Sequence, residues 1–373
     1  KKKWLSFGGW INAVIPVLIV PYYSVIGGWV IKYLVEYFRG NAKLLAEDGY
    51  FTDFISNGVS TELCFVAFCA FTLIIIFAGV QNGIERVSKI MMPILIVLSV
   101  IIAVYSVTRP GALAGVKYFL VPNVKNFSWM TVVSAMGQMF YSLSIAMGIL
   151  ITFGSYMKKD TAIEDSTRNV EVFDTGIAIM AGLMIIPAVF AFSGGDPDTL
   201  QAGPSLMFIT IPKVFQNMGF GTVIGIVFFL LVLFAAVTSS IALTESAVST
   251  FEDELGWGRK KATVLVGVIM LVLGSLSSLG YGPLAGIKII GMQFLDLFDF
   301  LTNSVMMPIA ALLTSLLVSR VVGIDKIEEE IIHGESAFRR KKVFVVMIKY
   351  LCPVFAIIIL LSSVANALGW IKM

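Results

Sequence analysis

Nine apolar segments, each long enough to cross a lipid bilayer, constrain this 373-residue chain more than any other feature. A transmembrane helix needs about 20 consecutive apolar residues, and only helices and closed barrels satisfy their backbone hydrogen bonds inside lipid. Charged residues, proline or glycine separate the segments, and the pattern predicts an all-α integral membrane protein. The segments cover residues 8–37, 61–82, 89–108, 131–155, 172–193, 219–249, 261–280, 289–319 and 344–369.

The composition excludes several other classes of protein. Hydrophobic residues make up 58% of the chain and charged residues 14%, and the net charge of +3 is too small to indicate a nucleic-acid partner. No Walker, Rossmann or zinc-spacing motif is present, and the single histidine, His333, does not predict a metal site, so nothing indicates an enzyme. Cys64, Cys69 and Cys352 lie in apolar segments, which predicts buried free thiols.

Positive charge differs between alternate connections. One set of connections, with the N-terminus, carries seventeen Lys and Arg residues, and the other set carries seven. Cytoplasmic connections are enriched in Lys and Arg, so the N-terminus is predicted to be cytoplasmic, and nine crossings then place Met373 outside. We therefore expect a multi-pass protein of the cell (inner) membrane, surrounded by lipid. A homodimer is a candidate assembly.

The fourth segment combines apolar residues with small and polar ones at its centre. Ser142, Ser144 and Gly148 lie in the middle of the stretch from Ala135 to Asp160. Small residues line close helix contacts in membranes, which is one interpretation. The alternative is a broken helix, whose free backbone groups face a buried ligand. The sequence alone leaves both open.

Two long outer connections are also informative. Residues 39–60 predict a partly helical cap. Residues 194–218 combine turn residues with the apolar run LMFITI, which a plain solvent loop would not need. We expect this connection to re-enter the protein as a lid.

Ionisable and hydroxyl groups inside the apolar segments are candidate functional groups, because burying them in lipid is costly. Asp174 has no basic residue within one helical turn on either side, which favours an ion site over a position in an inner vestibule. Thr238, Ser239 and Ser240 form a hydroxyl cluster that either bonds to its own helix or, with carbonyl oxygens, binds Na⁺. The acids at 252–254 and at 296 and 299 lie at segment ends, where charges are usually solvated.

Four motifs, in order, resemble the neurotransmitter:sodium symporter family, and its bacterial amino-acid transporters in particular. The motifs are GIERVSKIMMPIL (83–95), GQMFYSLSIAMGILITFGSYMKKD (137–160), FAAVTSSIAL (234–243) and FEDELGWGRKKA (251–262). The resemblance implies a LeuT-like fold of two inverted five-helix repeats with a broken helix. It also implies sodium-coupled symport of an amino acid by alternating access, with two Na⁺ sites.

The resemblance assigns roles to individual positions. Tyr23, in PYYSVIGGW, matches the tyrosine that binds the substrate carboxylate, and Tyr141 matches the aromatic lid over the substrate. The other residues that match the substrate pocket are Ile19, Ser144, Ala146, Met147, Ser240 and Leu243. Because most of this pocket is apolar, we expect a small apolar or aromatic amino acid.

The same resemblance assigns the ion sites and the gates. Ser142 and Asp174 match the first sodium site, where an aspartate in place of the family's asparagine adds a charge that could replace chloride. The second site matches the Ala235 carbonyl, Thr238 and Ser239. The outer gate acid matches Asp299, the inner gate acid Asp253, and the tyrosine supporting the inner gate Tyr156.

The chain opens at what resembles the third span of the family, so we expect the first two transmembrane helices to be lacking. Residues 1–130 would then be a remnant of the first repeat, 131–320 the second repeat, and 321–373 an inner loop and final helix. Both sodium sites would be incomplete in this chain, and no sodium-coupled uptake is expected from it alone. The alternative function is a truncated, non-transporting membrane scaffold or partner subunit derived from such a transporter.

Overall fold

The computed structural model describes residues 4–196, 200, 203–335, 337–367 and 370. This part of the chain is helical, with a single isolated β-bridge between Ile289 and Met292. The helices are α1 (Trp4–Phe38), α2 (Ala42–Leu45), α3 (Tyr50–Ser56), α4 (Gly58–Phe77), α5 (Arg86–Val107), α6 (Ala112–Leu120), α7 (Trp129–Ser142), α8 (Ile149–Ser155), α9 (Ile163–Ser193), α10 (Ile211–Gln216), α11 (Gly221–Leu255), α12 (Arg259–Leu279), α13 (Phe294–Asp299), α14 (Met307–Leu317), α15 (Ile324–Gly334), α16 (Lys341–Val346) and α17 (Cys352–Ala367).

Wider, π-helical turns join several of these helices into longer rods. They lie before α5 (Val80–Glu85), before α10 (Leu206–Thr210), between α13 and α14 (Phe300–Met306), after α14 (Val318–Val322) and between α16 and α17 (Met347–Leu351). A short 3₁₀ turn, Val124–Asn126, precedes α7.

Eight helical rods in the described part are long and apolar enough to span a membrane. They are Phe7–Phe38, Gly58–Phe77, Val80–Val107, Ile163–Ser193, Gly221–Leu255, Arg259–Leu279, Phe294–Val322 and Lys341–Ala367. These rods correspond to eight of the nine predicted segments. The remaining segment, 131–155, is divided between α7 and α8. The prediction of an all-α integral membrane protein is therefore confirmed.

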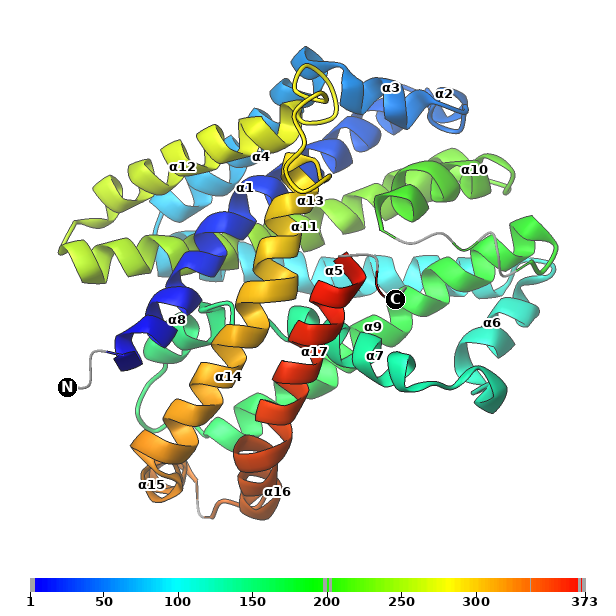
Figure 1. Ribbon diagram of the computed structural model, residues 1–373. Coiled ribbons are helices and arrows are strands. Elements are labelled where there is room, and N and C mark those ends of the chain that lie inside the picture. Colours follow the sequence, from blue (N-terminus) through cyan, green and yellow to red (C-terminus); the bar gives the residue numbers. More distant parts are fainter. Residues whose placement is uncertain (1–3, 197–199, 201–202, 336, 368–369, 371–373) are drawn as a thin grey trace.

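Helix α1 lies at the centre of the molecule and packs against α4, α11 and α12 (Figure 1). Its contact with α4 depends on Gly28, where a Cβ atom would lie only 2.7 Å from the backbone nitrogen of Phe65. In the C-terminal half of α1, Tyr33 stacks on Phe229 with ring centroids 5.2 Å apart and meets Phe208 edge-on at 5.1 Å. Edge-to-face and offset aromatic pairs at these separations stabilise a core.

Both long outer connections contain helices. Residues 39–60 contain α2 and α3, as the partly helical cap predicts. In the connection 194–218, residues 197–199 and 201–202 lie outside the described residues, but Leu206–Gln216 is helical and packs into the protein. The Tyr33 hydroxyl donates to the Phe208 carbonyl at 2.7 Å, and Lys213 forms an ion pair with Asp48. These contacts attach the re-entrant segment to α1 and to the connection after it.

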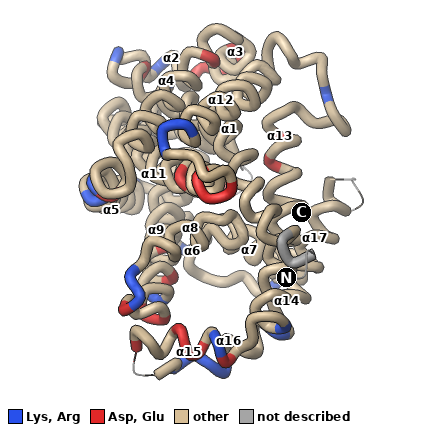
Figure 2. Tube along the Cα trace, turned by 90° about the vertical axis from the view of Figure 1, so that its left-hand side faces the viewer, with Lys and Arg blue, Asp and Glu red and all other residues tan. Residues whose placement is uncertain are grey.

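The opposite end of the molecule is rich in charge (Figure 2). There the loop after α15 contacts the first turn of α9. The Glu335 carboxylate accepts hydrogen bonds from the backbone N–H groups of Glu164, at 2.5 Å, and Asp165, at 3.3 Å. Arg340 bonds the Glu171 carboxylate at 2.8 Å. A carboxylate at a helix N-terminus satisfies free N–H groups and complements the helix dipole.

Candidate functional site

The backbone between α7 and α8 is not helical. Ser144, Ala146 and Gly148 have positive φ angles of 55°, 61° and 75°. The left-handed conformation costs an L-residue about 1–2 kcal/mol, so two such non-glycine residues require the surrounding structure to hold them. The fourth predicted segment is thus a broken helix.

Gly148 shows that close packing accompanies the break. A Cβ atom at this position would lie 2.8 Å from the Asn12 carbonyl oxygen and 2.9 Å from the Ser246 hydroxyl. The small residue lets the break lie directly against α1 and α11. Both interpretations of this segment, close packing of small residues and a broken helix, therefore describe part of the structure.

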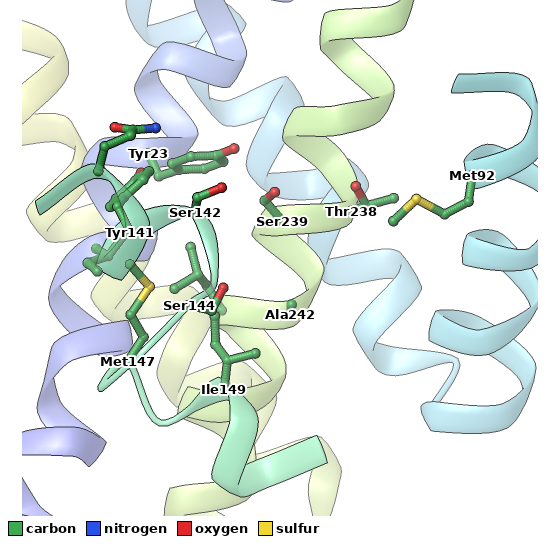
Figure 3. A pocket seen from close by; sticks show the side chains of 13 residues that line it. Tyr23, Met92, Tyr141, Ser142, Ser144, Met147, Ile149, Thr238, Ser239 and Ala242 are labelled. Atoms are coloured by element: carbon green, nitrogen blue, oxygen red, sulfur yellow. The ribbon is translucent and has the colours of Figure 1, made fainter. Parts of the chain in front are cut away.

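A cavity of about 450 Å³ lies beside the break, between α1, α5, α7, α8 and α11 (Figure 3). Six residues assigned to the substrate pocket line it: Ile19, Tyr23, Tyr141, Ser144, Met147 and Leu243. Ile19, Met147 and Leu243 are buried and present apolar surface. Among these six residues, the hydroxyl groups of the two tyrosines and of Ser144 are the polar ones, as in a small-molecule site with a few placed polar groups.

Two residues assigned to the pocket are not among those that line the cavity. Ser240 is fully buried, and its hydroxyl forms a hydrogen bond with that of Thr72 at 3.2 Å. Ala146 lies in the break, where it contributes its left-handed backbone. Four lining residues were not assigned from the sequence: Met92, Gln138, Ile149 and Ala242. All four fall inside the quoted motifs, so the signal available was their proximity to assigned residues.

The residues assigned to the first sodium site meet at the edge of the cavity. Ser142 lines the cavity, and its hydroxyl donates to Asp174 Oδ1 at 2.6 Å. Asp174 is partly buried and forms no ion pair within the described residues. A carboxylate and a hydroxyl, both hard oxygen ligands, are suited to a hard monovalent cation.

The second assigned group lies across the cavity on α11. Thr238 and Ser239 both line the cavity. The Thr238 hydroxyl donates to the carbonyl oxygens of Phe234 and Ala235, both at 3.0 Å, so bonding to its own helix does occur. A hydroxyl that donates its proton keeps lone pairs for a cation. Among the described residues, no three or more His, Cys, Asp and Glu side chains are grouped so that they could hold a metal ion.

Asp299, which the resemblance assigns as the outer gate acid, lies beside α1. Asp299 Oδ1 accepts hydrogen bonds from the Tyr22 hydroxyl at 3.2 Å and from the Asn303 amide at 2.5 Å. Tyr281, in the connection before α13, donates to Asp296 at 3.0 Å. Burial and the nearby Asp296 carboxylate raise the pKa of Tyr281 above its usual value.

The two residues assigned to the inner gate, Asp253 and Tyr156, are not brought together. Asp253 is exposed and forms no ion pair within the described residues. Tyr156 instead donates to Glu245 Oε1 at 2.7 Å, and Glu245, with no exposed surface, is bound by both terminal nitrogens of Arg259 at 3.0 and 2.5 Å. Of the acids at 252–254, Glu252 forms an ion pair with Arg259 at 3.6 Å.

Comparison with known sequences identifies the chain. A family model described as "Sodium:neurotransmitter symporter family" matches residues 51–370, more than half of the sequence. The chain belongs to this family. Its members are sodium-coupled symporters, which are transporters rather than enzymes, and the resemblance in the four motifs is thereby confirmed.

Several relatives of this symporter are sodium-dependent transporters. The protein YhdH of Bacillus subtilis is 34% identical over 95% of this chain and 79% of its own length. A sodium-dependent transporter of Haemophilus influenzae is 30% identical over 92% of the chain and 76% of its own length.

A solved structure supports the fold. The crystal structure of MhsT in complex with L-phenylalanine is 32% identical in sequence and matches with a TM-score of 0.83, over 96% of this chain and 81% of MhsT. The symporter thus has the LeuT-like fold expected from its motifs.

Proposed function

We propose that this symporter couples the movement of Na⁺ to that of a small apolar or aromatic amino acid by alternating access. The observation that carries the proposal is the Ser142–Asp174 pair at the edge of a cavity with apolar walls. In this proposal, Ser142 and Asp174 belong to one sodium site, and the Ala235 carbonyl, Thr238 and Ser239 belong to a second.

The lining of the cavity supports the substrate class. Tyr23 would bind the substrate carboxylate through its hydroxyl, while Ile19, Met147 and Leu243 would surround the side chain. Met147 is unbranched and flexible, so it can adapt to side chains of different shape. The crystal structure of the relative MhsT contains L-phenylalanine, which agrees with an apolar or aromatic substrate.

Coupling follows from the closeness of the two ligands. A substrate carboxylate near Ser142 would be attracted to the first cation, so that each ligand increases the affinity for the other. Ion binding then shifts the equilibrium between outward-open and inward-open states only as far as it prefers one of them. We also place the protein in the cell membrane, with the connections rich in Lys and Arg on the cytoplasmic side.

The test is uptake of labelled leucine and phenylalanine by proteoliposomes that contain the protein purified with its complete reading frame. We expect uptake down an inward Na⁺ gradient, which disappears when K⁺ replaces Na⁺ and is competed by unlabelled apolar amino acids. Uptake that does not depend on Na⁺ would refute the proposal. Lack of both uptake and binding would instead favour a non-transporting membrane scaffold.

A further inference from the structure

Asn303 holds the outer gate acid in one orientation. Its amide nitrogen donates to Asp299 Oδ1 at 2.5 Å and to the Tyr22 hydroxyl at 3.3 Å. The Tyr22 hydroxyl donates to the same carboxylate oxygen at 3.2 Å. Within the described residues the second oxygen of Asp299, Oδ2, accepts no hydrogen bond and forms no ion pair. The carboxylate is therefore fixed through one oxygen and free at the other.

The orientation of the Asn303 amide is fixed by this contact. Its carbonyl oxygen, Oδ1, is buried and has no partner in the described part of the chain. Turning the amide over would place this oxygen against the Asp299 carboxylate, where two acceptors repel each other. The structure thus leaves a buried acceptor unpaired in order to direct the amide nitrogen to Asp299, and such exceptions call for an explanation.

The local backbone brings these groups together. Asp299 and Asn303 are four residues apart, so their side chains share one face of the helix. The π-helical turn Phe300–Met306 begins directly after Asp299. Pro308 follows it and cannot donate to the carbonyl one turn before, which accounts for the widened turn. Such widened turns occur frequently at functional sites.

The same network reaches the substrate cavity through α1. Tyr22 is 2% exposed and faces Asp299 and Thr302, whereas the next residue, Tyr23, lines the cavity. Asn303 itself is not among the residues that line the cavity. It is therefore placed to act on Asp299 and α1 rather than on the substrate.

We propose that Asn303 is a positioning residue for transport, which together with Tyr22 fixes Asp299 Oδ1 and leaves Oδ2 directed to a cationic partner as the entrance closes. The inference rests on the symport proposed above. Its consequence is that Asn303 affects the rate of the closing step and leaves the binding of the amino acid largely unchanged.

The experiment is a double-mutant cycle of Asn303→Leu and Asp299→Asn, measured as Na⁺-driven uptake. A hydrogen bond to a charged group carries a larger effect than a neutral one, so we expect Asn303→Leu to lower Vmax about tenfold. The apparent KM for the amino acid should change less than about twofold, because a residue that acts only in the rate-limiting step changes the rate and not the binding of the substrate. In the Asp299→Asn background, Asn303→Leu should add less than a twofold loss.

Two variants serve as controls. Asn303→Gln retains an amide donor and should recover most of the lost Vmax. Ser315→Ala, further along the same rod, removes a hydroxyl whose only hydrogen bond among the described residues is to the Leu312 carbonyl, and it should leave uptake unchanged. An equal loss from Asn303→Leu in both backgrounds, or no recovery with Asn303→Gln, would overturn the inference.

Failure of the symport proposal has a separate signature. If the unmodified protein shows no Na⁺-dependent uptake, symport is refuted. The double-mutant cycle is then measured by thermal unfolding of the four proteins in detergent instead of by uptake. Coupled shifts of the unfolding midpoint would support the contact of Asn303 with Asp299, and additive shifts would refute it.

Discussion

Replacing Gly148 with alanine tests whether the break between α7 and α8 is imposed by its packing. The new Cβ would lie 2.8 Å from the Asn12 carbonyl oxygen and 2.9 Å from Ser246 Oγ, and the φ angle of 75° would remain. The left-handed conformation costs alanine about 1–2 kcal/mol. Overpacking against the backbone of α1, which cannot rotate away, adds about 1–3 kcal/mol. We therefore expect a destabilisation of about 2–5 kcal/mol.

The assay is thermal unfolding of the purified protein in detergent, followed by intrinsic fluorescence. The matched control is Gly154→Ala in α8, because a Cβ at Gly154 would meet no atom within 4 Å and the residue is helical. Alanine there should be neutral or stabilise the helix by up to about 1 kcal/mol. If Gly148→Ala and Gly154→Ala unfold at the same temperature, the argument from close approach and backbone conformation is wrong.

Three further predictions follow from the site and its surroundings. Asp174→Ala should abolish Na⁺-dependent uptake, and Thr238→Val with Ser239→Ala should raise the Na⁺ concentration for half-maximal uptake; unchanged Na⁺ dependence would remove these residues from the ion sites. Glu245→Gln should destabilise the protein by about 3–5 kcal/mol because it leaves Arg259 without its buried partner, whereas Asp253→Asn should leave the unfolding midpoint unchanged. Lys213 lowers the pKa of Asp48, so this pair stabilises the protein above about pH 4 and ceases to do so as pH falls through the lowered pKa. Lys213→Met should thus lower the unfolding midpoint at pH 7, and this effect should diminish as pH falls through the lowered pKa of Asp48.

The segment that contains the break could be located from local residues, but the choice of a broken helix over close packing came from the family resemblance. Hydroxyl groups and glycines at the centre of an otherwise apolar span are costly in a continuous lipid-facing helix, and they occur between Ser142 and Gly148. The left-handed conformations of Ser144 and Ala146 could not be predicted, since neither residue prefers a positive φ. Contacts with α1 and α11 decide them.

The inner side shows a different limit of sequence reasoning. The resemblance in FEDEL assigned Asp253 to the inner gate, which stays a prediction, whereas the buried Glu245, two turns earlier, was not assigned from the sequence. Residues seven apart share a helix face, so Glu245 and Glu252 both point to Arg259. Asp253 is one residue further along the helix, so its side chain lies on a different face. The sequence shows this spacing, but which face of α11 meets α12 depends on how the whole bundle packs.

The contact between Glu335 and the start of α9 has a mechanical consequence. This helix follows the broken one directly, and its first turn is bonded to the loop that joins α15 to α16. If the break acts as a hinge during transport, there are two outcomes at this end of the molecule: either the loop moves together with α9, or the backbone amides of Glu164 and Asp165 lose their carboxylate partner. Hydrogen exchange at the backbone amides of Glu164 and Asp165 would distinguish the two outcomes. Slow exchange during transport would indicate that the contact moves with α9, and faster exchange would indicate that it breaks in each transport cycle.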